Sequence, residues 1–177
     1  MEDKFSNFIT GFRKNQNTQH APLRMVEKWK SKLNIREKVA IIFMDLSKAF
    51  DSLNHSLMIA KLKAYGFDDN AINFIRSYFE NRLQCCKIND SFSSLQNVFA
   101  GVPQGSILGP LFFNIFINDI FFFLDKCSLG NYADDSTLYT SGNNLNEILH
   151  NLKTIFQYLR HGFIKTLLCS ILINVTS

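Results

Sequence analysis

Residues 132–135, Tyr-Ala-Asp-Asp, most restrict how this chain can fold. They separate two strand-like runs, 127–131 and 136–141, and so predict a tight turn between antiparallel strands. Adjacent carboxylates repel each other unless a cation lies between them, and a divalent metal ion makes such a pair favourable. We therefore expect Asp134 and Asp135 to be metal ligands. An ordinary acidic hairpin turn is the open alternative.

A third carboxylate, Asp45, ends the apolar run 39–44, which has the length and continuous hydrophobicity of a buried strand. A central sheet could bring this strand end beside the 132–135 turn. Three converging carboxylates would hold two Mg²⁺ ions about 3.5–4 Å apart, as in phosphoryl transfer. A helix cap is the alternative role of Asp45. The pair at 68–69 fits a helix start, so paired aspartates alone mean little.

Three motifs, in this order, resemble those of reverse transcriptases, with wording closest to jockey-like retrotransposons that lack long terminal repeats. They are FMDLSKAFD at 43–51, AGVPQGSILGPL at 100–111 and YADD at 132–135. GFRK at 11–14, followed by TQHA at 18–21, resembles the fingers-to-palm segment of the same family. The resemblance covers residues 11–158. It implies an α+β fold: the palm, with partial fingers, of a right-hand polymerase, with a small antiparallel sheet flanked by helices.

The resemblance also implies an activity, RNA-directed DNA synthesis, in which a primer 3′-OH attacks the α-phosphate of a dNTP. The partners would be an RNA template, a DNA primer and dNTPs. The cofactors would be two Mg²⁺ ions, with Mn²⁺ as the alternative ion. Asp45, Asp134 and Asp135 would be the catalytic residues and the metal ligands.

By the same resemblance, seven positions would bind the incoming nucleotide: Leu46, Ser47, Lys48, Ala49, Phe50, Gln104 and Gly105. The stretch 46–49 would offer backbone N–H groups to the triphosphate. The Phe50 ring would exclude a ribose 2′-OH by steric clash, although it could be one more core residue among 18 phenylalanines. Gln104 and Gly105 would line the nucleotide and template pocket, or form only an irregular helix entry.

Charge is uneven along the chain, whose net value is +4. The first 38 residues hold nine Lys or Arg against four Asp or Glu, which suits a polyanionic partner or a solvated basic helix face. Arg13 and Lys14 are the candidate nucleic-acid contacts in this segment, with a solvated basic loop as the alternative. Four cysteines without metal-ligand spacing indicate a reducing compartment. With no targeting signal seen, we expect a nuclear or cytoplasmic location.

The longest apolar run, 107–124, contains Asn114, Asn118 and Asp119, so we expect a buried helix and no membrane partner. Residues 1–160 are expected to form a partial reverse transcriptase domain, a fingers remnant with the palm. Residues 161–177 are expected to be a divergent apolar tail, with no thumb. Endonuclease and thumb regions of a full-length element protein would be missing, as in a palm excised from a polyprotein. One alternative is a truncated, inactive remnant that at most binds nucleic acid, and another is an intron-encoded maturase.

The pattern of apolar residues predicts helices and strands as follows. Helices are expected at 18–34, from a cap at 51 or 52 to 65, from 68 or 69 to 81, from the loop at 101–110 to 124, and at 145–160. Strands are expected at 39–44, 82–89, 93–100, 127–131 and 136–141.

Overall fold

The structure is a computed structural model, and it describes residues 4–45, 50–162 and 168–174. Side chains are described for 4–44 and 50–159. The chain divides into two compact units: Met1–Lys48 together with Ile117–Ser177, and Ala49–Phe116. Each unit is described by itself.

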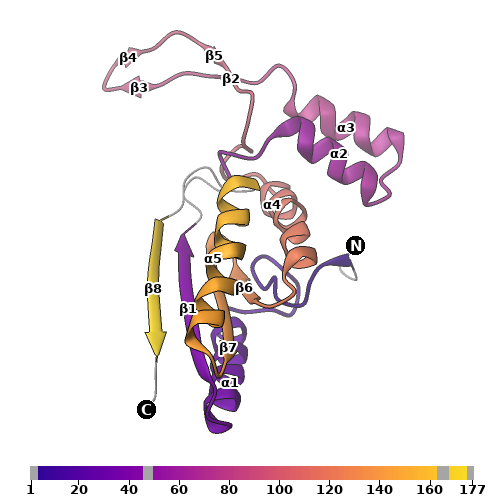
Figure 1. Cartoon of the computed structure of the whole chain (residues 1–177). Helices are drawn as coiled ribbons and strands as arrows, with labels where there is room; N and C mark the ends of the chain where they lie inside the picture. The colour runs from indigo at the N-terminus through magenta and orange to yellow at the C-terminus, as the bar shows by residue number, and fades with distance from the viewer. Residues whose placement is uncertain (1–3, 46–49, 163–167, 175–177) are drawn as a thin grey trace. The chain divides into compact units, whose positions relative to one another are not determined.

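The first unit is built on a four-stranded antiparallel sheet in the order β6-β7-β1-β8 (Figure 1). Its strands are β1 (Lys38–Asp45), β6 (Ser128–Tyr132), β7 (Asp135–Gly142) and β8 (Leu168–Asn174). The small antiparallel sheet expected from the sequence is therefore present. β8 comes from the apolar tail, and its backbone pairs along the edge of β1 that β7 leaves open. An apolar run of strand length can complete a sheet edge in this way.

Helix α1 (His20–Asn34) packs on one face of the sheet. Met25, Trp29 and Leu33 recur every fourth residue, which places them on one stripe of the helix. They pack against Val39, Ile41 and Tyr139, which lie on one face because strand side chains alternate. The helix begins two residues later than predicted, where the Asn17 side chain accepts the N–H groups of Gln19 and His20.

Helix α5 (Leu145–Gly162) matches the helix predicted at 145–160 and lies in front of β7 and β1 in Figure 1. Its buried residues are Ile148, Leu152 and Leu159, one stripe of the predicted amphipathic pattern. Ile42 and Leu138 alternate with the residues under α1 and are also buried. The sheet is thus flanked by helices, as expected for the polymerase palm.

The second unit contains three helices among its described residues: α2 (His55–Ala64), α3 (Asp69–Phe79) and α4 (Gly109–Asn118), whose last two residues belong to the first unit. The predicted cap of α2 at 51 or 52 is wrong: the cap is Asn54, whose side chain accepts the Leu57 N–H at 2.8 Å. Asp68 caps α3 as predicted, accepting the Ala71 N–H at 2.9 Å. After α4 the chain continues as a 3₁₀ turn, Asp119–Phe123, where the sequence predicted one helix to 124.

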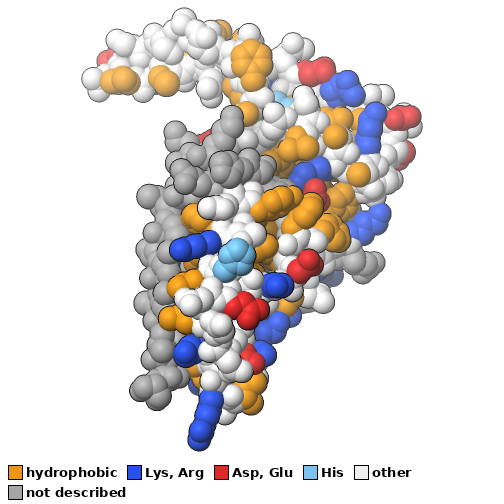
Figure 2. All heavy atoms as spheres, viewed as in Figure 1, with side chains coloured by type: hydrophobic (Ala, Val, Ile, Leu, Met, Phe, Trp, Pro, Cys, Tyr) orange, Lys and Arg blue, Asp and Glu red, His pale blue; other side chains and the backbone are white. Residues whose placement is uncertain are grey.

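The strands predicted at 82–89 and 93–100 are much shorter than expected. Two-residue ladders form instead: β2 (Leu83–Gln84) with β5 (Gln96–Asn97), and β3 (Lys87–Ile88) with β4 (Ser91–Phe92). Without a second layer to cover it, this segment leaves 72% of Ile88 and 65% of Phe92 exposed. Figure 2 shows hydrophobic side chains on its surface. An isolated hairpin of this kind is only marginally stable in water, which explains the short ladders. No helix in the described part of the chain is long and apolar enough to cross a membrane.

Candidate active site

The 132–135 turn joins β6 to β7 in the first unit. Tyr132 and Asp135 are paired, so only two residues make the connection. Ala133 adopts a φ of 55°, and a residue with a side chain is strained in this left-handed region. Two-residue hairpins with positive φ at the first position usually place glycine there. Asp134 and Asp135 are exposed, so the turn presents both carboxylates to solvent.

Asn131 fixes this turn from beneath. Its side chain is buried, with 1% exposed, and its Nδ2 donates to the Ala133 carbonyl at 2.7 Å and to Ser136 Oγ at 2.9 Å. A third, longer bond reaches the Asp135 carbonyl at 3.3 Å. One amide therefore ties both sides of the strained turn together. The sequence interpretation missed this residue, and the signal was a polar side chain in the buried run that ends at the turn.

The amino-terminal segment supports the same turn from the other side of β6. Ile9 forms a parallel bridge with Asn131, and the Asn131 backbone bonds the Phe8 carbonyl and the Thr10 N–H, both at 3.0 Å. Gly11 packs on the backbone of the turn, since a Cβ at this position would overlap the Ala133 nitrogen. Glycine is required here by close approach. The segment predicted to link fingers and palm thus braces the acidic turn.

Asp45 lies at the end of β1, and its Cα is paired with that of Asp135 in the β1–β7 register. The backbone arrangement that the sequence interpretation required, a strand end beside the acidic turn, is therefore present. The Asp45 side chain lies outside the described side chains, so its role as a ligand stays a prediction.

The donor set at the turn suits a hard divalent cation. Carboxylate oxygens are the ligands that Mg²⁺ prefers. Neither Asp134 nor Asp135 makes a side-chain hydrogen bond or ion pair with the described residues, so their oxygens remain open to ligands. Among the described side chains, no group of three or more His, Cys, Asp or Glu could hold a metal ion. The Asp45 side chain is not among them.

Three of the residues predicted to bind the incoming nucleotide are described by the structure: Phe50, Gln104 and Gly105. All three lie in the second unit. The Phe50 ring is half-buried and packs on Phe113 with centroids 4.9 Å apart, while the Phe50 carbonyl accepts the Val102 N–H at 3.0 Å. Gln104 is exposed. Gly105 has a φ of 79°, and no atom lies within 4 Å of a Cβ built on it. Its glycine is thus explained by backbone conformation rather than by packing inside this unit.

Residues 46–49, predicted to bind the triphosphate, lie outside the described residues. Arg13 is engaged within its own loop: its guanidinium donates to the Ser6 and Ile9 carbonyls at 2.8 and 3.1 Å and lies over the Phe5 ring. These contacts hold the segment that braces the turn. Lys14 is exposed. Nucleic-acid binding by Arg13 and Lys14 stays a prediction.

Solved structures with a similar fold define the class of protein. Apo telomerase from Candida tropicalis superposes with a TM-score of 0.67 at 15% identity, over 91% of this chain and 36% of that one. Telomerase from Candida albicans, in complex with a fragment of telomeric RNA, gives 0.65 at 15% identity, over 95% and 32%. At this identity the likeness concerns the fold. With the antiparallel sheet and the acidic turn, it defines a partial palm of a right-hand polymerase.

The chain belongs to the reverse transcriptase (RNA-dependent DNA polymerase) family, whose model matches residues 1–166. A probable RNA-directed DNA polymerase from transposon BS of Drosophila melanogaster is 32% identical over 81% of this chain. The RNA-directed DNA polymerase from the mobile element jockey of the same species is 27% identical over 78%. The predicted family and its jockey-like kind are therefore confirmed. This chain spans 16% of the length of each of these two relatives.

Proposed function

We propose that this chain carries the catalytic centre of an RNA-directed DNA polymerase of a retrotransposon. The main support for this proposal is the pairing of Asp45 with Asp135 in the sheet, which brings the end of β1 beside the turn that contains Asp134. Directly opposed residues of an antiparallel pair have Cβ atoms about 5 Å apart, so two such carboxylates are within reach of a shared metal ion. Membership of the reverse transcriptase family supports this assignment.

The residues at the turn fit a divalent metal, and the family generally uses such ions. In the proposed site, Asp45 and Asp134 hold two Mg²⁺ ions, or Mn²⁺ in their place, and Asp135 completes the acidic centre. Bound there, the ions would activate the primer 3′-OH and neutralise charge on the α-phosphate and the leaving group. The chain's own part is to fix the carboxylates, and the Asn131 amide does this by closing the strained turn. Carboxylates held in place before the substrate arrives need little reorganisation during reaction.

We assign substrate selection to residues 46–49 and to residues of the second unit. We propose that 46–49 offer backbone N–H groups to the dNTP triphosphate, and that Gln104 and Gly105 line the nucleotide and template pocket. The open space above Gly105 suits close approach of a ligand to the backbone. The Phe50 ring, which packs on Phe113, would exclude a 2′-OH by steric clash. A steric clash with the ribose 2′-OH is sufficient to select deoxynucleotides over ribonucleotides.

Primer extension on an RNA template tests the proposal. The chain is compared with Asp134→Asn in Mg²⁺, and Asp69→Asn serves as the matched control because Asp69 belongs to the other aspartate pair and is exposed in α3. We expect incorporation of dNTPs to fall at least a hundredfold in Asp134→Asn and to stay within twofold in Asp69→Asn. Equal incorporation by all three proteins would refute the catalytic assignment. No incorporation by any of them, with retained salt-dependent RNA binding, would identify an inactive remnant.

Metal binding gives a second measurement that does not depend on activity. Mn²⁺ titrated into the chain and followed by its electron paramagnetic resonance signal should bind more weakly to Asp134→Asn than to Asp69→Asn. Unchanged Mn²⁺ affinity in Asp134→Asn would remove this carboxylate from the metal site.

A further inference from the structure

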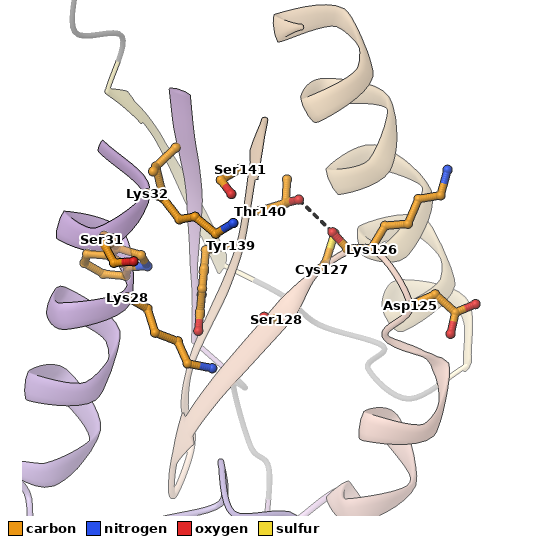
Figure 3. Close-up of a pocket in the computed structure, with 12 residues that line it drawn as sticks. Lys28, Ser31, Lys32, Asp125, Lys126, Cys127, Ser128, Tyr139, Thr140 and Ser141 are labelled. Atoms are coloured by element: carbon orange, nitrogen blue, oxygen red, sulfur yellow. Dashed lines mark hydrogen bonds between the residues drawn. The ribbon is translucent and has the colours of Figure 1, made fainter. Parts of the chain in front are cut away.

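A cleft of about 360 Å³ opens between α1 and the β6–β7 hairpin, within the first unit (Figure 3). This volume is in the range of small-ligand sites. Tyr139, in its wall, is four residues along β7 from Asp135, or ~14 Å at the rise of an antiparallel strand. The cleft is therefore separate from the acidic turn, and the proposed reaction leaves it without a role.

Two donor groups in the cleft wall are buried and poorly satisfied. Tyr139 is 6% exposed, and neither its hydroxyl nor the indole N–H of Trp29 makes a hydrogen bond of good geometry with the described residues, although the Ser128 side chain interacts with the Tyr139 hydroxyl. The rings meet edge to face, with centroids 5.8 Å apart, so the packing that forms the core also fixes both donors. Buried Tyr and Trp side chains normally find a hydrogen-bond partner, and an unmet buried donor lowers the stability of the fold.

Tyr139 acts as a donor because it keeps its proton. Burial raises the pKa of its hydroxyl, and a side-chain hydrogen bond with Ser128 and the charge of Arg24 only partly counteract this rise. Other polar groups in the wall are already satisfied: Thr140 donates to the Lys126 carbonyl at 2.6 Å, and Ser141 donates to Glu37 at 2.6 Å.

Lys28 supplies positive charge at the end of the cleft to which the Tyr139 hydroxyl points (Figure 3). Its ammonium lies 4.2 Å from the centroid of the Phe8 ring, and the Arg24 guanidinium lies 5.3 Å from the same centroid. These cations are one helical turn apart, a spacing at which like charges destabilise a helix. Burial, with a further contribution from Arg24, lowers the pKa of Lys28. An anion at this position would offset both effects.

The second lysine that reaches toward the cleft, Lys32, is held by Glu37 at 3.4 Å. Lys126 and Asp125 line the opposite rim, and their side chains point away in Figure 3. Among the described residues, Lys28 is therefore the cation at the cleft that is directed toward it without an ion pair.

We propose that this cleft binds a backbone phosphate of a single-stranded nucleic acid, with Lys28 providing the charge and Tyr139 and Trp29 the hydrogen bonds. A phosphodiester offers only acceptors, the Lys28 ammonium and the Trp29 indole N–H are donors only, and the protonated Tyr139 hydroxyl can donate as well. The choice of a polynucleotide as the source of the phosphate rests on the proposed function. In this proposal, this face of the palm binds RNA at a place distant from the acidic turn.

Trp29 is the single tryptophan of the chain, so its fluorescence reports on the cleft directly. A twelve-nucleotide uridine RNA, uridine monophosphate and inorganic phosphate are each titrated in EDTA, so that metal binding and catalysis play no part. The variants are Lys28→Gln and Tyr139→Phe. The matched control is Lys30→Gln, on the same helix and outside the cleft. Asp134→Asn should bind RNA as the parent chain does, which separates this proposal from the catalytic one.

We expect RNA to change the emission of Trp29, and Lys28→Gln to weaken RNA binding about fivefold. The same substitution should reduce the slope of log affinity against log salt by about one, as loss of one phosphate contact does. Tyr139→Phe should weaken binding about threefold, and Lys30→Gln less than twofold. Equal weakening by Lys28→Gln and Lys30→Gln would overturn the proposal. A response to inorganic phosphate or the mononucleotide but not to RNA would also overturn it, in favour of a small-anion site.

Discussion

The Asn131 amide should control the stability of the acidic turn, and Asn131→Asp tests this without changing the shape of the side chain. The substitution replaces Nδ2, which donates to the Ala133 carbonyl at 2.7 Å and to the Asp135 carbonyl at 3.3 Å, by an oxygen that cannot donate when ionised. The third partner, Ser136, can turn its hydroxyl to donate instead. The other side-chain oxygen, Oδ1, has no hydrogen-bond partner among the described residues before the substitution, so the substitution removes no hydrogen bond from it.

The expected cost follows from these contacts. Loss of the short and the long hydrogen bond lowers the free energy of unfolding by roughly 1.5 kcal/mol. The new buried carboxylate then lies against two carbonyl oxygens that have lost their donor, which lowers it by about 1–3 kcal/mol more. We expect Asn131→Asp to lower the free energy of unfolding by about 3 kcal/mol at pH 7, a large share of the roughly 5–15 kcal/mol typical of a domain. By linkage, 3 kcal/mol corresponds to a rise of about two units in the pKa of the new carboxyl group.

The pH dependence gives the sign of the effect. A carboxyl group whose pKa is raised in the folded state favours folding most when it is protonated, below its unfolded pKa of about 4, and this contribution is lost as pH rises through the folded pKa near 6. The deficit of Asn131→Asp should therefore be about 3 kcal/mol at pH 7 and shrink to about 1 kcal/mol or less at pH 4.5.

Urea unfolding followed by Trp29 fluorescence measures these values, because the indole packs on Tyr139 in the same sheet. Asn146→Asp is the matched control: Asn146 is exposed at the start of α5, and the same substitution should change stability by no more than about 0.5 kcal/mol. The reasoning fails if Asn131→Asp and Asn146→Asp are equally stable at pH 7, or if the deficit of Asn131→Asp does not shrink on acidification.

Three further outcomes are expected. Gly11→Ala should destabilise the chain by about 1–3 kcal/mol, because a Cβ there overlaps the backbone of the acidic turn, whereas Gly142→Ala meets only an ordinary contact at 3.6 Å; equal urea midpoints would contradict this. Burial raises the pKa of Cys127 from 9.0 to about 11, so iodoacetamide at pH 8 should alkylate the exposed Cys85 first, and stability should fall as pH rises from 9 to 11; mass spectrometry showing early alkylation of Cys127 would be inconsistent with its burial. Phe50→Val should admit ribonucleotides more readily in primer extension, and an unchanged ratio of dNTP to NTP incorporation would refute its assignment as a steric gate.

The sheet and its acidic turn could be predicted because their signals are local. A continuous apolar run ending on Asp45 and two short runs around 132–135 specify strands by hydrophobic periodicity, and α5 follows from one apolar stripe. The 82–100 segment had strand-like residues but produced only two-residue ladders. Strand propensity depends on a partner layer, and the residues around Ile88 and Phe92 have none inside this unit.

The sequence by itself determined the family, the α+β class and the three aspartates, because each is written in contiguous residues whose order and spacing can be compared. Only the tertiary structure decided what holds the acidic turn: Asn131 from beneath, and Gly11 against the backbone of Ala133. It also decided that Arg13 binds its own loop and that Tyr139 and Trp29 face a cleft with unmet donors. Gly11 and Ala133, like Trp29 and Tyr139, are more than a hundred residues apart, and local patterns carry no information about which distant atoms will meet when the core forms. The contacts of Asn131 and Arg13 join residues close in sequence, but they depend on side-chain directions that the pattern of residue types does not give.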